Sequence, residues 1–192
     1  MRTDVRSIPL VVAIRLMGAL VLFLAGNLFA AEQSNLQVGT LAEGGVHATA
    51  TLLIPAPLGD VQAILSDYTH WPDLFDTPMR LARLERQGGR VITDLYISHT
   101  LLLGERRLIC ESRELPEGGL VTTLLGGDFK QYLRTWRLSP ADGGRQTRAE
   151  FAILVEVDTL VPDWLVALAM RRELETHFRI LAEKAAARER AH

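Results

Sequence analysis

The sequence predicts an α+β domain in which a curved antiparallel sheet of about seven strands wraps around a long C-terminal helix. Apolar and polar residues alternate with a period of two over residues 79–158, which is typical of strands with one buried face. From Pro162 to about Arg190, apolar residues instead recur every three or four positions, which indicates a helix. A sheet that is apolar on one face buries that face against such a helix.

The first predicted strand is the segment VHATATLLI, residues 46–54. Val46 and Ala48 belong to one face of this strand, and His47 and Thr49 belong to the other. Pro55 ends the strand, because proline has no amide hydrogen for the ladder.

A short amphipathic helix is predicted to follow. Pro57 suits its first turn, and the charge of Asp60 is favourable near its N-terminus. Its apolar face comprises Leu58, Val61, Ile64, Leu65 and Tyr68. We expect Pro72 to end the helix, because proline disfavours helical geometry at the preceding Trp71.

Six further strands are predicted between this helix and the last one. Pairs of glycines at 88–89, 118–119, 126–127 and 143–144 separate the alternating runs, and glycine adopts the turn conformations of hairpins without steric cost. The connections are too short for crossovers, so the strands are mostly antiparallel. The predicted strands are residues 79–87, 90–100, 104–115, 119–125, 130–139 and 146–157.

The C-terminal helix carries one apolar stripe along its length. Glu175, Arg179 and Glu183 lie at four-residue spacing on another face, which indicates solvent. The start of the helix, from Trp164 to Met170, is apolar all round and needs a second apolar neighbour: a loop, a ligand or a membrane surface. The stripe consists of Ala167, Met170, Leu174, Phe178, Leu181 and Ala185.

The N-terminus has the order of a secretory signal peptide. Three arginines precede or enter the apolar segment LMGALVLFLAG, and small residues follow at Ala30 and Ala31. The predicted organisation is a signal peptide at 1–30, a linker at 31–45 and a domain at 46–190. The alternative is an uncleaved anchor in the inner membrane, since residues 8–31 are long enough to span it. Either way, we expect an exported, periplasmic protein.

Composition and motifs exclude several classes of function. A formal net charge of −2 gives no basic surface for nucleic acid. The five histidines lack the spacing of metal ligands, and no nucleophile elbow or phosphate-binding glycine loop occurs, so we expect no metal and no cofactor. The single cysteine, Cys110, forms no internal disulfide and is expected to be a small buried apolar residue.

Three segments carry a resemblance to a known family: AILSDYTHWPDLF, YLRTWRLSPADGGRQTRAEFAILVEV and VPDWLVALAM. In this order of elements the chain resembles the START-like helix-grip (SRPBCC) superfamily over about Val46 to Ala187, in particular its polyketide cyclase or coenzyme-Q-binding branch. In that family the long helix and the curved sheet enclose an elongated apolar cavity. The resemblance therefore implies a helix-grip fold and a hydrophobic small-molecule partner.

Candidate ligand-binding residues come from the inward strand faces and from the ends of elements. Arg134 either meets a ligand carboxylate or carbonyl, or lies over aromatic rings on the solvent side. The aromatics at element ends, Trp71, Phe75 and Trp164, form either a gate or a lipid-facing rim at the cavity mouth, or else plain core. The inward faces form either a cavity or a packed core. The candidates are Trp71, Phe75, Leu95, Ile97, His99, Leu108, Cys110, Tyr132, Arg134, Trp136, Phe151, Ile153, Trp164 and Leu168.

The function that these observations favour is an exported carrier of a lipid, isoprenoid quinone or polyketide-like compound, with contact to a membrane surface. One alternative is a cyclase or dehydratase that uses the same cavity, with His99 or Tyr132 as proton donor. Another is a protein-interaction module of the cell envelope. The sequence favours binding over catalysis without deciding between them.

Overall fold

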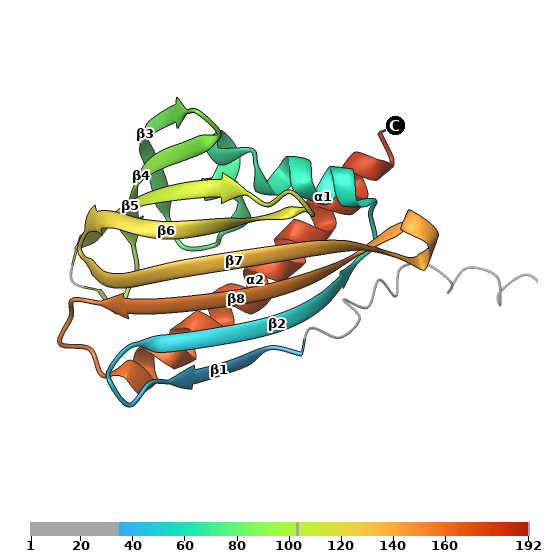
Figure 1. Cartoon of the computed structure of the whole chain (residues 1–192). Coiled ribbons are helices and arrows are strands. Elements are labelled where there is room, and N and C mark those ends of the chain that lie inside the picture. Colours follow the sequence, from blue (N-terminus) through green and yellow to red (C-terminus); the bar gives the residue numbers. More distant parts are fainter. Residues whose placement is uncertain (1–34, 103, 192) are drawn as a thin grey trace, which may run out of the picture. The chain divides into compact units, whose positions relative to one another are not determined.

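The computed structural model describes residues 35–102 and 104–191 (Figure 1). The predicted signal peptide or anchor, residues 1–30, lies outside the described residues. The predicted fold class is confirmed: a curved antiparallel sheet covers a long C-terminal helix. The elements in chain order are β1 (Gln37–Thr40), β2 (Val46–Ile54), α1 (Leu58–Leu65), the 3₁₀ helix η1 (Tyr68–Leu74), β3 (Met79–Gln87), β4 (Arg90–Ser98), β5 (Glu105–Glu114), β6 (Gly119–Gly127), β7 (Phe129–Ala141), the 3₁₀ turn η2 (Asp142–Gly144), β8 (Gln146–Val157) and α2 (Asp163–Glu189).

The sheet has eight strands in the order β1-β2-β8-β7-β6-β5-β4-β3, and every neighbouring pair is antiparallel. The eighth strand, β1, corrects the sequence prediction, which placed residues 31–45 in a linker. β1 pairs with β2 over only four residues, from Gln37 opposite Thr49 to Thr40 opposite Val46. A strand this short carries no readable alternation, and its existence depends on the neighbour that supplies its hydrogen bonds.

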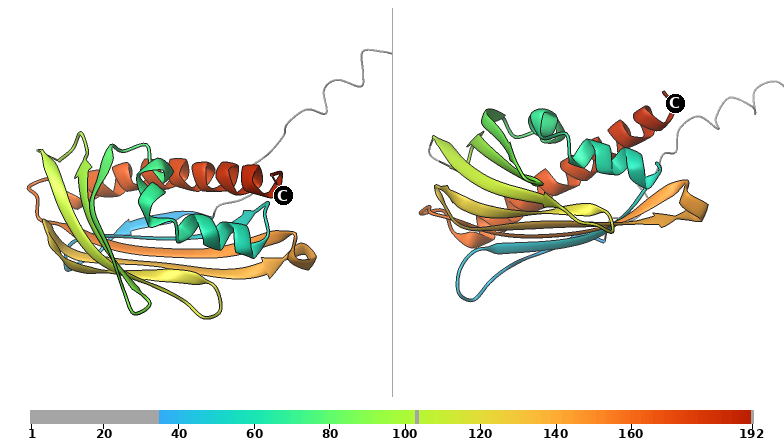
Figure 2. Two further views of the ribbon diagram at one scale, coloured as in Figure 1. Left: turned by 90° about the horizontal axis from the view of Figure 1, so that it is seen from above. Right: turned by 45° about the horizontal axis from the view of Figure 1, so that its top comes forward.

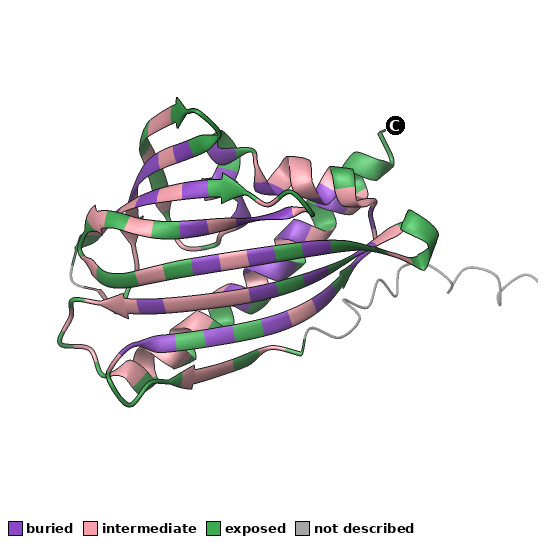
Figure 3. Cartoon of the chain, in the orientation of Figure 1, coloured by how far each residue is buried: buried purple, intermediate pink, exposed green. Residues whose placement is uncertain are grey.

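The sheet curves around α2, which crosses its concave face (Figure 2). Buried and exposed residues alternate along the central strands (Figure 3), as the period-two pattern predicted. A compact aromatic core forms where α2 crosses β7 and β8: the ring centroids of Trp136 and Phe151 are 4.7 Å apart, and those of Phe151 and Phe178 are 5.1 Å apart. All three rings are buried in the hydrophobic core.

The helix predicted up to Pro72 is shorter than expected. α1 ends at Leu65, and the chain turns at Asp67, where ψ is 71°, into η1, which contains Pro72. The indole Nε1–H of Trp71 donates a hydrogen bond of 2.9 Å to the carbonyl of Leu65, so η1 folds back and satisfies a carbonyl at the end of α1. The side chain of Gln62 fixes α1 to the β5–β6 connection, accepting from the Gly119 amide at 2.6 Å.

Glycine is required at the two ends of β6. Gly119 has φ of +99° and Gly127 has φ of +109°, a region that L residues rarely adopt. A Cβ on either would lie 2.2 Å from a neighbouring carbonyl oxygen, of Trp136 or Arg107 respectively. The close approach of backbones at these corners lets β5, β6 and β7 bend toward α2.

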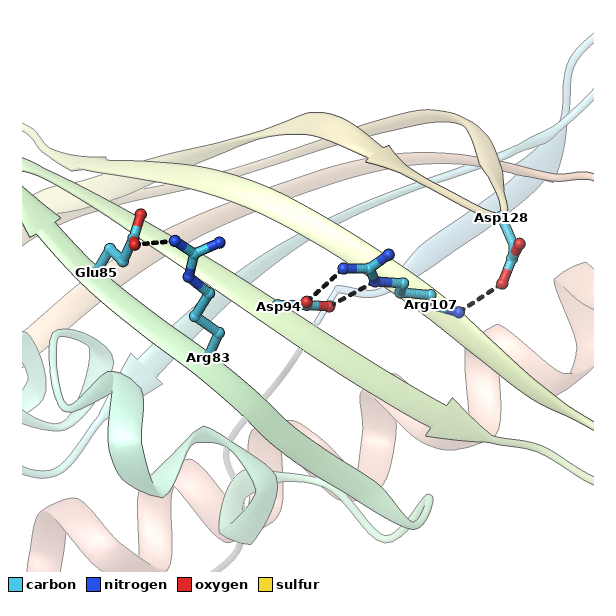
Figure 4. Close-up of polar contacts among 5 residues, drawn as sticks. All are labelled: Arg83, Glu85, Asp94, Arg107 and Asp128. Carbon is cyan, nitrogen blue, oxygen red and sulfur yellow. Dashed lines mark hydrogen bonds and ion pairs between the residues drawn. The ribbon is translucent and has the colours of Figure 1, made fainter.

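Charged residues occupy the outer face of β3, β4 and β5 (Figure 4). Arg107 donates two hydrogen bonds to the carboxylate of Asp94, at 3.0 and 2.7 Å, and its backbone amide donates to Asp128 at 2.7 Å. Arg83 pairs with Glu85 on the same face. The hydrogen bonds from Arg107 hold the pKa of Asp94 below its usual value. These polar groups thus lie on the outer face of the strands, and apolar residues lie on the inner face.

Candidate ligand-binding cavity

A cavity of about 190 Å³ lies between the first half of α2 and the concave face of the sheet. Strands β3 to β8, η1 and the β4–β5 connection contribute to its wall. Residues of the wall are mostly apolar. They are Trp71, Phe75, Thr77, Met79, Leu95, Ile97, His99, Leu101, Leu102, Leu108, Cys110, Thr122, Phe129, Tyr132, Arg134, Ile153, Val157, Val166, Ala169, Met170, Glu173 and Leu174.

The size of this cavity suits a small apolar body. Engineered apolar cavities of about 150 Å³ in other proteins stay dry and bind benzene. A cavity of about 190 Å³ therefore has room for a fused ring or a short acyl chain. Burial of apolar ligand surface there contributes roughly 25 cal/mol per Å² before the costs of association, so affinity depends mainly on how much of the ligand is apolar.

The cavity has a buried end and a half-exposed end. Along β7, Phe129 is half-buried, Arg134 is buried, and the next inward residue, Trp136, belongs to the filled core. The wall residues of the β4–β5 connection and of the start of α2 are half-buried, whereas the buried ones come from η1, from strands β4 to β7 and from Leu174 of α2. The buried set is Trp71, Leu95, Leu108, Cys110, Thr122, Arg134 and Leu174.

Arg134 is the charged residue of the inner end. Its Cζ lies 4.4 Å from the centroid of the Trp71 ring, within the range of a cation–π interaction. Its register partners are Thr122 on β6 and Ile153 on β8, both of which also line the cavity. Arg134 is only 6% exposed, and its Nε has no hydrogen-bond partner. The solvent-side alternative for Arg134 is therefore wrong, because β7 turns this face toward α2.

Two further titratable groups of the wall stay neutral near pH 7. Burial raises the pKa of the Cys110 thiol to about 12, although the charge of Arg134 acts in the opposite direction. Burial likewise raises the pKa of Tyr132. Neither group adds a negative charge beside Arg134.

His99 and Glu173 form a polar contact at the half-exposed end of the cavity. His99 Nε2 lies 3.9 Å from Glu173 Oε1, across the gap between the end of β4 and α2. The backbone amide of Leu101 donates to His99 Nδ1 at 3.1 Å, which places the proton of the neutral ring on Nε2, toward Glu173. The other carboxylate oxygen of Glu173 is buried and has no hydrogen-bond partner. Both side chains belong to the wall of the cavity.

Comparison with known proteins agrees with this architecture. The model of the family described as polyketide cyclase / dehydrase and lipid transport matches residues 45–188. The chain belongs to this family. No curated protein matches the chain.

Solved structures of other proteins share the helix-grip fold of the family. A Thermus thermophilus protein is 21% identical, with a TM-score of 0.61, over 73% of this chain and 97% of that one. The Zhui aromatase/cyclase from a Streptomyces species is 15% identical, with a TM-score of 0.59, over 74% and 94%. A START superfamily protein from Mycobacterium smegmatis is 18% identical, with a TM-score of 0.57, over 73% and 97%. At these identities the likeness concerns the fold alone.

Most of the residues predicted for the site lie on the wall of the cavity. Their part in binding a ligand stays a prediction. Trp71 lies at the buried end rather than at a gate, and Phe75 stacks on His177 with 4.3 Å between ring centroids. The predicted residues on the wall are Trp71, Phe75, Leu95, Ile97, His99, Leu108, Cys110, Tyr132, Arg134 and Ile153.

Four predicted site residues lie elsewhere. Trp136 and Phe151 belong to the filled core, because α2 packs directly on them through Phe178. Trp164 and Leu168 are each 63% exposed on the outer side of α2 and do not line the cavity. The all-round apolar start of α2 thus turns one side to the cavity, through Val166, and the other side to solvent.

Sequence reasoning missed several wall residues. Glu173 lies three residues after Met170 and next to Leu174, both in the predicted apolar stripe, so its position beside that stripe was the available signal. Leu101 and Leu102 follow β4 in a connection, where periodicity gives no orientation.

His177 was interpreted as one of several scattered histidines, yet it is buried with Nδ1 2.8 Å from the Leu74 carbonyl.

Residues 35–102 and 104–191 contain neither a metal cluster nor a membrane-spanning helix. No group of three or more His, Cys, Asp or Glu side chains in these ranges could hold a metal ion. No helix in the same ranges combines the length and the apolar character that crossing a membrane requires.

Proposed function

We propose that this chain is an exported carrier that holds a hydrophobic small molecule, such as a lipid, an isoprenoid quinone or a polyketide-like compound, in the cavity beneath α2. The observation that carries the proposal is the cavity of about 190 Å³ with a mostly apolar wall. An apolar wall of this extent favours an apolar occupant over water. Membership of a family described by polyketide cyclase, dehydrase and lipid transport supports the same class of ligand.

Ligand carriage is tested by purifying the protein without detergent, extracting it with organic solvent and searching the extract by mass spectrometry. A stoichiometric apolar compound is the expected result. A cavity-filling variant provides the matched test: Ala169 lines the cavity, whereas Ala167, on the same helix, does not. Ala169→Phe should abolish recovery of the compound and Ala167→Phe should not. Recovery of no compound, together with no binding of the neutral probe N-phenyl-naphthylamine, would reject carriage.

Export rests on the N-terminal sequence alone. Basic residues, an apolar segment and small residues at Ala30 and Ala31 follow one another in the order of a signal peptide. The test is the intact mass of protein recovered from the periplasm and from the membrane after expression of the full chain. A mass that lacks about 30 residues supports cleavage, a full-length mass in the membrane fraction supports an anchor, and protein confined to the cytoplasm contradicts export.

Contact with a membrane surface is supported by an apolar patch at the start of α2. Leu160, Trp164 and Leu168 are all strongly exposed, and the neighbouring Val166 lines the cavity. The patch adjoins the point where the N-terminal segment meets the domain, since Arg171 Nη1 donates to the Leu36 carbonyl at 3.4 Å. Residues 1–34, which precede this point, include the predicted signal or anchor.

Vesicle binding tests the membrane contact. Co-sedimentation with neutral phosphatidylcholine vesicles should fall in a Trp164→Ser, Leu168→Ser double variant. The control is Leu133→Ser, an exposed leucine on β7 outside the patch. Equal sedimentation of both variants and of the unchanged protein would reject a role for the patch.

The second candidate is an enzyme of the cyclase or dehydratase type, favoured by the contact between His99 and Glu173. His99 lines the cavity with its Nε2 3.9 Å from Glu173 Oε1, so the protonated form of its ring would have the placement of a general acid. Substitution distinguishes the two functions: His99→Gln and Tyr132→Phe should leave the extracted ligand of a carrier unchanged. An enzyme with these variants should lose turnover while keeping its substrate.

A further inference from the structure

We infer that the ligand is a monoanionic carboxylate amphiphile whose carboxylate pairs with Arg134 at the inner end of the cavity, while its apolar body extends toward the half-exposed end. This inference rests on the proposed carrier function and names the ligand class of the same cavity.

The main observation is a buried guanidinium without a counterion. Arg134 is 6% exposed, its Nε has no hydrogen-bond partner, and no carboxylate of the described residues forms an ion pair with it. A buried charge that is neither paired nor hydrogen-bonded is costly, so such residues are normally matched by an opposite charge. The guanidinium does contact the ring of Trp71, but the attraction of a ring is weaker than that of a carboxylate.

The placement of Arg134 leaves its hydrogen-bond donors available to a ligand. The Trp71 ring approaches the guanidinium at 4.4 Å from Cζ to the ring centroid, and Arg134 is also one of the residues that line the cavity. A ring makes no hydrogen bonds to the N–H groups in the plane of a guanidinium, and two of these groups match a carboxylate in a bidentate pair. Arg134 can therefore receive a carboxylate without giving up its contact with Trp71.

The surrounding wall favours one negative charge rather than two. Among the described wall residues Arg134 is the only arginine or lysine, and the wall already holds one carboxylate, Glu173, whose Oε1 lies 3.9 Å from His99 Nε2, so the wall has no positive charge for a second anionic charge on a ligand. Thr122, directly opposite Arg134 in register, is hydrogen-bonded to Ser112 at 2.9 Å and adds no charge. A phosphate dianion would leave a charge unmatched in an apolar cavity, whereas a carboxylate is neutralised by the single guanidinium.

The depth of Arg134 sets the orientation of the ligand. Beyond Arg134 on the same face of β7, Trp136 packs against Phe151 in the filled core, and the half-buried Phe129 lies at the opposite end of this stretch of β7. The carboxylate is thus the innermost group of the ligand, and the apolar body contacts the walls contributed by β4, β5 and α2. An uncharged head at this position would leave the guanidinium unpaired, which gives the cavity selectivity for the acid over its neutral analogue.

Calorimetric titration with matched acid and alcohol pairs tests the inference on the full folded protein. Octanoate and octanol share an acyl chain, and naphthoate and naphthol share a fused ring, so the two pairs also distinguish an acyl body from an aromatic one. The acid of the preferred pair should bind about tenfold or more tightly than its alcohol at pH 7.5. Arg134→Gln should remove this preference while the alcohol still binds. Arg137→Gln, an exposed arginine on the outer side of β7, is the matched control and should leave it unchanged.

The outcomes separate the inference from the proposed function. Binding of neither acids nor alcohols would reject carriage itself. Equal affinity for acid and alcohol, or an acid preference that survives in Arg134→Gln, would reject the role of Arg134 while leaving a neutral hydrophobic ligand. Thermal unfolding shows whether the variant is folded. Without ligand, Arg134→Gln should be at least as stable as the unchanged protein. Marked destabilisation would show that Arg134 is structural and would overturn the inference.

Discussion

The indole of Trp71 joins two parts of the molecule: its ring lies against the guanidinium of Arg134, 4.4 Å from Cζ, and its Nε1–H donates to the carbonyl of Leu65. One side chain thus supports the cavity and ends helix α1. The ring of Trp71 also contacts Tyr68, with 4.7 Å between centroids. Binding at Arg134 and the stability of the α1–η1 segment are therefore coupled through this residue.

Trp71→Phe should lower the free energy of unfolding by about 1–3 kcal/mol, because the Leu65 carbonyl loses its donor in a buried environment. The phenyl ring keeps an aromatic surface near Arg134, so binding of an acid should change less than stability does. Urea unfolding followed by circular dichroism measures the first effect. An unchanged midpoint and slope would contradict the role of the indole in ending α1.

The buried His177 should make stability fall in mild acid. Burial lowers its pKa to about 4, opposed by the Leu74 hydrogen bond, and the ordinary value is about 6.5. Between these two pKa values the unfolded chain binds more protons than the folded protein does. The contribution of His177 to the free energy of unfolding is therefore fully present above about pH 6.5 and is lost as the pH falls toward 4. The full loss is on the order of 3 kcal/mol.

Urea unfolding at pH 7 and pH 5 measures this dependence. His177→Gln should flatten it, even though the variant itself is less stable at pH 7. The control is His70→Gln, because His70 is exposed beside Asp67 and should leave the dependence in place. An equal pH dependence in all three proteins would show that other groups cause it.

Cys110 should resist thiol reagents in the folded protein. A pKa of about 12 leaves about one thiol in ten thousand ionised at pH 8, and the side chain is buried. Reaction with a chromogenic disulfide reagent should be slow in buffer and fast in urea. Because Cys110 lines the cavity, a bound ligand should slow the reaction in buffer further. Rapid modification in buffer, unaffected by octanoate or octanol, would contradict this placement.

Asp94 should stabilise the outer face of the sheet at pH values above the pKa of its carboxyl group. The hydrogen bonds from Arg107 lower its pKa, so its contribution is present above the ordinary value of 3.8 and is lost as the pH falls through the lower folded value. Asp94→Asn should lower the free energy of unfolding at pH 7, and the effect should be modest because solvent screens the partly exposed Arg107. Chemical unfolding at pH 7 and pH 3 measures it, and the difference between variant and unchanged protein should shrink at pH 3.

The sequence by itself determined the order of the elements and the inward face of most strands. Period-two alternation fixed the faces of β2 and β8, and the bounds of β3 were predicted to the residue. This information is local, since the pattern of each strand indicates which of its faces avoids water. The same local reasoning failed at α1, where a contact between Trp71 and Leu65 decides where the helix ends.

Only the tertiary structure decided which inward residues border empty space. Arg134 and Trp136 are two positions apart on one face of β7, yet the first lines the cavity and the second is sealed beneath Phe178. The difference arises from where α2 crosses the sheet, and alternation in β7 carries no information about that crossing. The same limit applies to α2: Trp164 and Leu168 belong to its apolar start, yet both are exposed because the cavity covers only one side of the helix. Periodicity records burial against a partner, whereas a cavity depends on the distance between partners that are remote in sequence.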